Sequence, residues 1–241
     1  HIGRLYDSAN VIALKIPLTK DEMKEAVKKT VNANDLKDPY IRLVVTRGIG
    51  NLGLDPRKCP KPQIIIIIDT IQLYPEKLYK EGLNAIVVPT IRNHYEALNP
   101  RIKSLNYLNN IMAKIECTSV NKDEAIMLNK DGYVAEGSGD NIFIIKDAEL
   151  CTPPKSSGIL VGITRNEIIK LAKEQGMIVK EEELTRYDLY TADECFLTGT
   201  AAQIISVVTI DGRTIADGKP GKYTLKLPKG FLNIINNYQG D

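Results

Sequence analysis

The sequence predicts a mixed α/β (α+β) fold divided into two domains, and three observations support this. Segments with helical periodicity alternate with short apolar runs typical of strands along the chain. The length of 241 residues suits one large domain or two modest ones. The segment from Asp69 to Pro75 breaks both patterns, and we interpret it as a connection. We therefore expect a small domain over residues 1–69, an interdomain loop over 70–76 and a larger domain over 77–241.

Composition excludes several classes of protein. Hydrophobic residues make up 43% and charged residues 26% of the chain, which is ordinary for a globular protein. The net charge is only +2, with no basic stripe, so we expect no nucleic-acid partner. The longest apolar run, Ile64 to Ile68, is too short to cross a membrane, so we expect no membrane association and predict a strand buried on both faces.

The numbers and spacing of cysteine and histidine limit the kinds of metal site and catalytic site that we expect. The four cysteines lie far apart without a CxxC pair, which is typical of reduced thiols and predicts a cytoplasmic location. The chain has only two histidines, so a histidine-based metal site or a Ser-His-Asp triad has little to draw on. We expect no metal.

The first domain has two predicted helices and two predicted strands. Apolar spacing predicts a helix over residues 1–14, and Thr19 to Glu22 resembles the cap of a second helix that reaches Asn34. Residues 39–47 and 64–68 are predicted strands, separated by a glycine-rich turn. Alternation places Tyr40 and Arg42 on the same strand face, where the guanidinium needs either a ligand anion or a structural ion pair.

The second domain is predicted to be rich in strands. Helices are expected at 108–117, 164–175, 187–191 and, interrupted by Pro228 and Gly230, in the last stretch. Strands are expected at 85–88, 124–129, 133–136, 141–145, 149–152, 177–179, 194–197 and 205–210. Asp131-Gly132 is typical of a hairpin turn, and Gly176 is expected to end the helix before it.

Lys103 lies between two apolar residues, at the junction of a predicted strand and a predicted helix. Partial burial there would lower the pKa of its amine and make it a nucleophile able to form a Schiff base. Because most lysines are solvated surface residues, the pattern alone leaves both interpretations open.

Three further segments can bind anions or a heterocycle. Gly162-Ile163-Thr164 opens a helix, where free N–H groups attract phosphate, although Thr164 could also be a simple N-cap. Thr198 to Ala201 is either a carboxylate-binding or phosphate-binding turn or an ordinary tight turn. Glu136 precedes two glycines, and its carboxylate could keep a pyridine nitrogen protonated or could be an exposed turn acid.

Together these motifs resemble the fold-type IV (D-amino-acid-aminotransferase-like) enzymes that use pyridoxal 5'-phosphate (PLP). The similar segments surround Arg4, Lys103, Glu136, Gly162 to Arg165 and Thr198 to Ala202, in the same order. Within that group, Tyr40-Ile41-Arg42-Leu43 and Asn51 to Pro56 resemble branched-chain-amino-acid aminotransferases. The similarity extends from Ile2 to about Tyr238. The usual chain starts with further small-domain strands, so we expect the N-terminal part to be truncated here.

The resemblance implies a role for each matching residue. Lys103 would bond to PLP and then move a proton between the substrate Cα and the cofactor. Glu136 would pair with the pyridine nitrogen, Tyr107 would hydrogen-bond the ring hydroxyl, and Leu160 would pack on the ring. The residues expected to hold the cofactor phosphate are Arg4, Ile163, Thr164 and Thr200.

The resemblance also implies substrates and assembly. Thr200 and Ala201 would present N–H groups to the substrate carboxylate, and Tyr40 and Arg42 would line the side-chain pocket. The implied reaction is ping-pong transfer of an amino group from leucine, isoleucine or valine to 2-oxoglutarate. A homodimer or larger homo-oligomer is expected.

Alternatives of the same fold are D-amino-acid aminotransferase, aminodeoxychorismate lyase and a non-catalytic relative. The first carries Arg and His where this chain has Leu52 and Leu54, and the second lacks the Tyr-Ile-Arg-Leu strand. A non-catalytic relative would lack the visible absorption of bound PLP.

Overall fold

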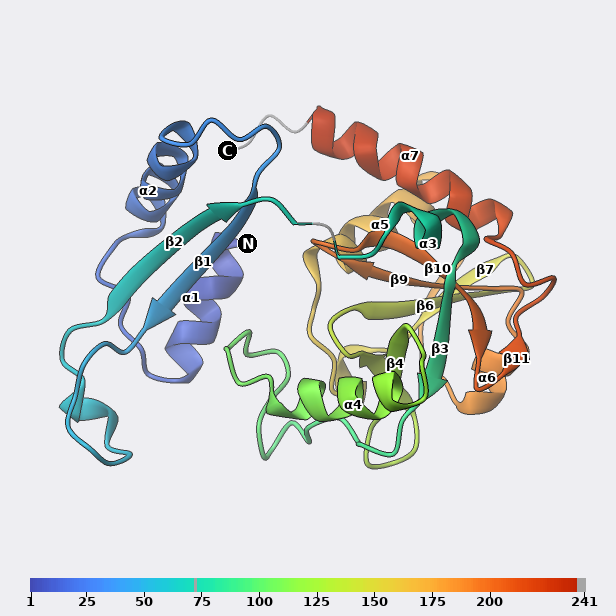
Figure 1. Cartoon of the computed structure of the whole chain (residues 1–241), viewed down its shortest axis with the longest axis horizontal. Coiled ribbons are helices and arrows are strands. Elements are labelled where there is room, and N and C mark those ends of the chain that lie inside the picture. The colour runs from blue at the N-terminus through green and yellow to red at the C-terminus, as the bar shows by residue number, and fades with distance from the viewer. Residues whose placement is uncertain (72, 238–241) are drawn as a thin grey trace. The chain divides into compact units, whose positions relative to one another are not determined.

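The computed structural model describes residues 1–71 and 73–237, except for the side chain of Lys229. The chain forms two compact units (Figure 1). Residues 1–72 and 102–104 make the first unit, and residues 73–101 and 105–241 make the second. The short segment that carries Lys103 therefore belongs to the first unit, although the predicted second domain, 77–241, had included it.

The first unit contains two helices and a two-stranded sheet among the described residues. Its elements are α1 (Ile2–Val11), α2 (Lys20–Asn32), β1 (Tyr40–Thr46), a 3-10 turn η1 (Pro56–Lys58) and β2 (Gln63–Asp69). The cap predicted for α2 is confirmed, because Glu22 N donates to Thr19 Oγ1 at 3.2 Å and Thr19 N donates to Glu22 Oε2 at 2.7 Å. Helix α1 ends earlier than predicted, since Ala13 adopts a left-handed φ of 51°.

The prediction that Ile64 to Ile68 is buried on both faces is wrong. Among the described residues, strand β2 pairs antiparallel with β1 alone, and the residues of β2 alternate between exposed and half-buried. Ile65 and Ile67 remain 46% and 45% exposed. Helix α2 packs against β2, and a single helix can cover only one face of a two-stranded sheet.

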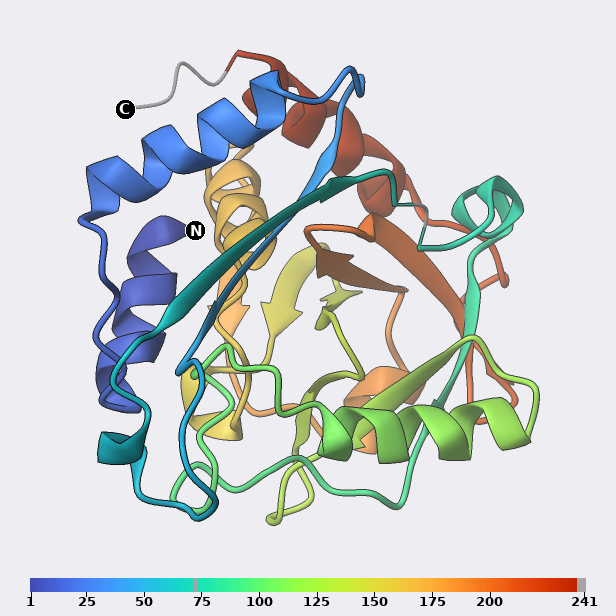
Figure 2. The same cartoon turned by 60° about the vertical axis from the view of Figure 1, so that its left-hand side comes forward.

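The second unit is a mixed sheet with helices packed on it (Figures 1 and 2). Among the described residues the strand order is β5-β4-β3-β10-β9-β6-β7-β8, and β11 pairs with β10. Most neighbours are antiparallel, but β3 runs parallel to both β4 and β10, and β7 runs parallel to β8. The strands are β3 (Leu83–Val87), β4 (Glu124–Leu128), β5 (Val134–Gly137), β6 (Asn141–Lys146), β7 (Glu149–Thr152), β8 (Val179–Glu181), β9 (Glu194–Gly199), β10 (Gln203–Ile210) and β11 (Arg213–Thr214).

Helices complete the second unit. They are α3 (Glu76–Glu81), α4 (Leu108–Ser119), a 3-10 turn η2 (Lys155–Ser157), α5 (Ile163–Glu174), α6 (Arg186–Tyr190) and α7 (Lys222–Asn236). The predicted strand at 177–179 is shifted to β8, and α3 and β11 were not predicted. The Asp131-Gly132 turn between β4 and β5 and the stop at Gly176 are confirmed, with φ of 85° and 79° at the two glycines. No helix in the described part of the chain is long and apolar enough to cross a bilayer.

Helix α7 continues through Pro228 and Gly230, which contradicts the predicted interruption. The helix packs against α5 and β10. A Cβ at Gly230 would lie 2.9 Å from Leu171 Cδ2, so the glycine permits the close approach of α7 to α5. Tertiary packing therefore overrides the local preference against these residues in a helix.

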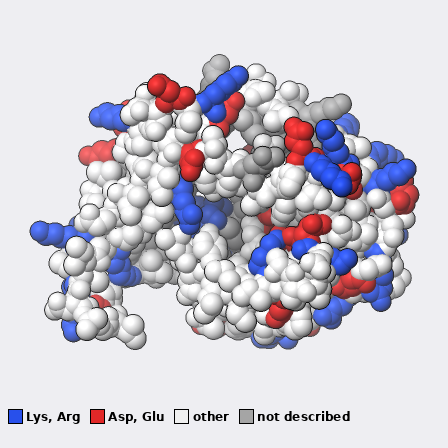
Figure 3. All heavy atoms as spheres, in the orientation of Figure 1, with Lys and Arg blue, Asp and Glu red and all other residues white. Residues whose placement is uncertain are grey.

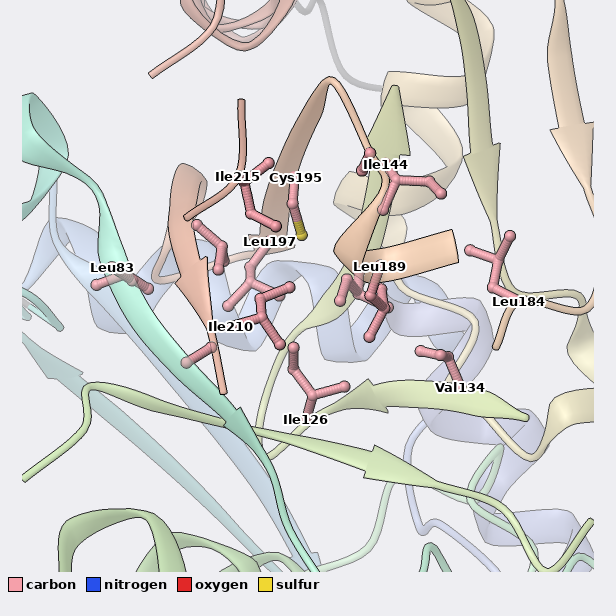
Figure 4. Close-up of a cluster of buried hydrophobic side chains, with 14 of the residues drawn as sticks. Leu83, Ile126, Val134, Ile144, Leu184, Leu189, Cys195, Leu197, Ile210 and Ile215 are labelled. Atoms are coloured by element: carbon pink, nitrogen blue, oxygen red, sulfur yellow. The ribbon is translucent and has the colours of Figure 1, made fainter. Parts of the chain in front are cut away.

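Three apolar clusters hold the described part of the second unit together, and the smallest includes Ala113 of α4 and Met127 of β4. Figure 4 shows the largest cluster, in which Ile126, Ile144, Leu197 and Ile210 converge from neighbouring strands. The second cluster lies under α5 and α7, and in it Phe143 stacks on Phe196 with ring centroids 5.1 Å apart. On the face shown in Figure 3, basic and acidic side chains are interspersed over the second unit.

Replacing Phe196 with alanine tests the importance of this stack. Phe196 is fully buried, so Phe196→Ala should lower the free energy of unfolding by about 3–5 kcal/mol. Urea unfolding followed by far-UV circular dichroism measures the change. The exposed Ile178 provides the control, because Ile178→Ala should change the same quantity by less than about 0.5 kcal/mol. Equal losses in the two variants would contradict the role of the stack.

Candidate active site

Glu136 lies near the end of β5 and is only 5% exposed, so the interpretation as an exposed turn acid is wrong. Its Oε1 accepts a hydrogen bond from Arg92 Nε at 2.8 Å. Its Oε2 accepts bonds from Asn141 Nδ2 at 3.1 Å and from Leu160 N at 3.0 Å. A buried carboxylate needs such partners, because burying an unpaired charge costs several kcal/mol. The structure thus holds one acid rigidly inside the second unit.

Arg92 is the most important residue that the sequence analysis missed. Its guanidinium is buried, and Nη1 donates to Asn109 Oδ1 at 2.9 Å. Asn109 Nδ2 in turn donates to Ile91 O at 2.8 Å. Asn109 lies in the first turn of α4, two residues after Tyr107 at the N-cap. The ion pair therefore links Glu136 to the start of α4, where the predicted cofactor ligand Tyr107 stands 37% exposed.

Asn141 connects the other predicted segments to Glu136. It is the first residue of β6, its Nδ2 also donates to Leu160 O at 2.8 Å, and it pairs with Thr198 of β9. A Cβ at Gly162 would lie only 2.1 Å from Asn141 Oδ1, so a residue with a side chain at 162 would displace it. The asparagine belonged to the Glu136 motif, but no pattern in the sequence indicated its contacts.

The N-terminus of α5 has the features of an anion-binding site. Its N-cap is Gly162, and no described side chain caps the first turn. The interpretation of Thr164 as the N-cap is therefore wrong: Ile163 and Thr164 are the first two helical residues, the threonine being buried. First-turn N–H groups without helical partners attract anions such as phosphate.

Arg165 anchors this helix from behind. It is almost completely buried and donates from Nη2 to Pro153 O at 2.9 Å and to Glu181 Oε2 at 2.7 Å. The hydrogen bond from Arg165 lowers the pKa of the Glu181 carboxyl. The arginine thereby fixes the start of α5 to the loop before it and to β8.

The Thr198 to Ala201 segment ends β9 and starts the turn to β10. Thr200 is exposed and Ala201 is half-buried on this turn. A Cβ at Gly199 would lie 2.0 Å from Asp140 Oδ1, so glycine is required for the close approach of Asp140. Tyr79 Oη donates to Ala202 O at 3.2 Å and steadies the other end of the turn.

The first unit brings Lys103 close to α1. The backbone N–H of Lys103 donates to Ser8 Oγ at 3.1 Å, and Ser8 lies one helical turn after Arg4 on the same face. Lys103 itself is exposed, so the predicted partial burial is wrong. The reason is its place on a loop, since loops run over protein surfaces.

Tyr40 and Arg42 share one face of β1, as predicted. Arg42 is exposed and makes no ion pair with a residue that the structure describes. Among the described residues no hydrogen bond joins either side chain to Lys103.

Residues 1–210 match the family Amino-transferase class IV. The chain belongs to the class IV aminotransferases. It is 53% identical to a putative branched-chain-amino-acid aminotransferase of Methanocaldococcus jannaschii, over 97% of this chain and 80% of the relative.

Two solved structures of class IV aminotransferases have the same fold. The branched-chain amino acid aminotransferase of Escherichia coli matches with a TM-score of 0.94 and 35% identity, over 97% of this chain and 78% of that one. The branched-chain amino acid aminotransferase from T.th., complexed with N-(5'-phosphopyridoxyl)-L-glutamate, matches with a TM-score of 0.92 and 34% identity, over 98% and 77%. The predicted fold-type IV fold is thereby confirmed.

Replacing Arg92 with methionine tests the buried ion pair. Arg92→Met leaves the Glu136 carboxylate without its cation, so we expect a loss of about 3–5 kcal/mol in unfolding free energy. Adding Glu136→Gln removes the uncompensated charge and should restore part of that loss. Chemical denaturation measures the free energy of unfolding of the two variants and of an Arg186→Met surface control. A double variant no more stable than the single one would show that the charges are not coupled.

Proposed function

We propose that this chain is a PLP-dependent transaminase that moves the amino group of leucine, isoleucine or valine to 2-oxoglutarate in a ping-pong reaction. The observation that carries the proposal is the arrangement around Asn141. There a buried carboxylate, the Leu160 backbone and the uncapped start of α5 meet within one unit. The identity to branched-chain aminotransferases across nearly the whole chain supports the substrate class.

The described residues include the kinds of hydrogen-bond donor and acceptor that the ring nitrogen, ring hydroxyl and phosphate of PLP require. Glu136 provides a fixed carboxylate for a protonated ring nitrogen. Leu160, whose backbone N–H donates to Glu136, is the proposed apolar contact of the ring. Ile163, Thr164, Thr200 and Arg4 are the proposed phosphate ligands, and Tyr107 the proposed ligand of the ring hydroxyl. When bound, PLP supplies a ring that takes up the electron pair released at the substrate Cα.

Lys103 is the proposed catalytic residue. With PLP present, its Nζ would hold the cofactor through the aldehyde carbon, with loss of water, and would carry the proton to and from the substrate Cα. The bond from Lys103 N to Ser8 Oγ fixes the backbone that bears this side chain. Its exposed position leaves the amine accessible to an incoming ligand.

Substrate selection is assigned to two segments. Thr200 and Ala201 present backbone N–H groups to the α-carboxylate, and Tyr40 with Arg42 lines the side-chain pocket. Since Arg42 has no ionic partner among the described residues, its guanidinium is available for the second carboxylate of glutamate or 2-oxoglutarate. Leu52 and Leu54 argue against a D-amino-acid aminotransferase, because they stand where that enzyme carries Arg and His.

A homodimer or larger homo-oligomer is part of the proposal. Leu108, Ile111, Met112 and Ile115 form one exposed apolar stripe on α4, with spacing typical of a helix face that packs on another protein surface. Leu52 and Leu54 are also fully exposed. A second copy of the chain would bury such residues.

The cytoplasmic location remains a prediction.

Replacing Lys103 with alanine tests the catalytic assignment. Lys103→Ala should abolish turnover with leucine and leave PLP bound without a covalent bond. Borohydride reduction followed by peptide mass spectrometry should find the phosphopyridoxyl group on Lys103 in the wild type and none in the variant. The exposed Lys77 is the control, and Lys77→Ala should keep both activity and labelling. Full activity in Lys103→Ala would refute the assignment.

Replacing Arg42 with alanine tests the proposed acidic subsite. A charge-assisted hydrogen bond contributes about 1.5–3 kcal/mol, so Arg42→Ala should slow the glutamate half-reaction about tenfold or more. The leucine half-reaction should change much less, because an isobutyl side chain makes no such bond. Single-turnover spectra with each substrate measure the two rates. Equal losses would remove the role of Arg42, and Arg42→Lys should recover part of the glutamate rate.

A further inference from the structure

A second buried carboxylate lies behind the turn that follows Glu136. Glu124 is the first residue of β4 and is 2% exposed. Its Oε2 accepts hydrogen bonds from Tyr74 Oη and from Lys114 Nζ, both at 2.8 Å. Its Oε1 accepts from Ser138 N at 2.9 Å and from the Ser138 hydroxyl. The proposed reaction uses none of these groups directly.

Ser138 is the member of this network that reaches the candidate site. It lies two residues after Glu136 and three before Asn141, in the turn that joins β5 to β6. Ser138 O also accepts a bond from Asn110 Nδ2 at 2.6 Å, so the turn is held from α4 as well. This turn therefore connects the end of β5, which carries Glu136, to the start of β6, which begins with Asn141, and its position affects both residues.

The same turn contacts the proposed carboxylate-binding segment. Gly137 N donates to Asp140 O at 2.7 Å, and Asp140 is packed against Gly199. A displacement of the turn would therefore move Glu136 on one side and the start of the Thr200 turn on the other.

The charge of Glu124 is compensated inside the network. Burial acts to raise the pKa of its carboxyl, but the Lys114 ammonium and the hydrogen bonds from Lys114, Ser138 and Tyr74 outweigh it, and the pKa is lowered. The ionised form is thus the one that the surrounding donors stabilise.

We propose that Glu124 is a positioning residue that acts through Ser138 to hold Glu136 and Asn141 in place for the ring of PLP. This inference rests on the proposed function. Neutralising Glu124 weakens the bonds to Ser138, lets the turn shift and loosens the contact between Glu136 and the ring nitrogen.

Glu194 offers a closely matched control. It is also the first residue of a strand, β9, is 7% exposed, and accepts bonds from Tyr223 N, Thr224 N and Thr224 Oγ1 at 3.0, 2.8 and 2.7 Å. Its bonds hold the start of α7, at the end of β9 opposite to Gly199. Loss of this carboxylate should affect stability alone.

The experiment compares Glu124→Gln with Glu194→Gln in the full chain. Both variants should lose stability, because each weakens a buried hydrogen-bonded carboxylate. PLP titration of the apoprotein, followed by fluorescence quenching, should show affinity reduced about tenfold or more in Glu124→Gln and unchanged in Glu194→Gln. The pH at which the visible band of bound PLP changes should shift only in Glu124→Gln.

Ser138→Ala provides a second test if Glu124→Gln does not fold. It removes only the hydroxyl, so PLP affinity should fall in the same direction but by less. Once Glu124 is already glutamine, adding Ser138→Ala should have no further effect on affinity. PLP affinities that are equal in Glu124→Gln, Glu194→Gln and the wild type, or additive effects of the Glu124 and Ser138 changes, would overturn the proposal. Failure of the wild type to bind PLP would instead overturn the proposed function, and this inference with it.

Discussion

The buried ion pair between Arg92 and Glu136 is the interaction on which the candidate site of the second unit depends. Two charges removed from water are stable only when they are close together and when their remaining donors and acceptors are satisfied. Glu136 meets this condition through Asn141 and Leu160 N, and Arg92 meets it through Asn109. One electrostatic requirement thus brings together β5, β6, α4 and the loop before α5.

Close packing around this pair explains the glycines in the motifs better than backbone freedom does. Gly162 has an ordinary φ of −67°, and what its missing Cβ provides is space for Asn141 Oδ1. Gly199 provides space for Asp140 in the same way. Each glycine lets a polar side chain approach a turn whose backbone N–H groups are proposed ligands. The motif glycines therefore serve the polar network as much as the turns.

Local signals in the sequence were sufficient for most helices and strands, but not for contacts between distant segments. The Thr19 cap and the Gly176 stop depend on neighbours within a few residues, and both were predicted. Arg92 lies in a loop without periodicity, and its partner is 44 residues away, so no pattern indicated it. The continuity of α7 through Pro228 was missed for the same reason, since it is decided by packing against α5 and β10.

Glu124 and Glu194 show why burial alone does not identify a functional acid. Both begin a strand, both are buried, and both accept hydrogen bonds from the backbone and hydroxyl of a single residue. Glu124 also accepts hydrogen bonds from Lys114 Nζ and Tyr74 Oη. The two carboxylates differ in what they hold, because Thr224 lies in the first turn of a helix that packs on the sheet, whereas Ser138 lies between Glu136 and Asn141. Whether a buried acid in this fold matters for function therefore depends on the segment that it holds in place. It matters when that segment is connected by hydrogen bonds or by the chain to the proposed cofactor-binding residues.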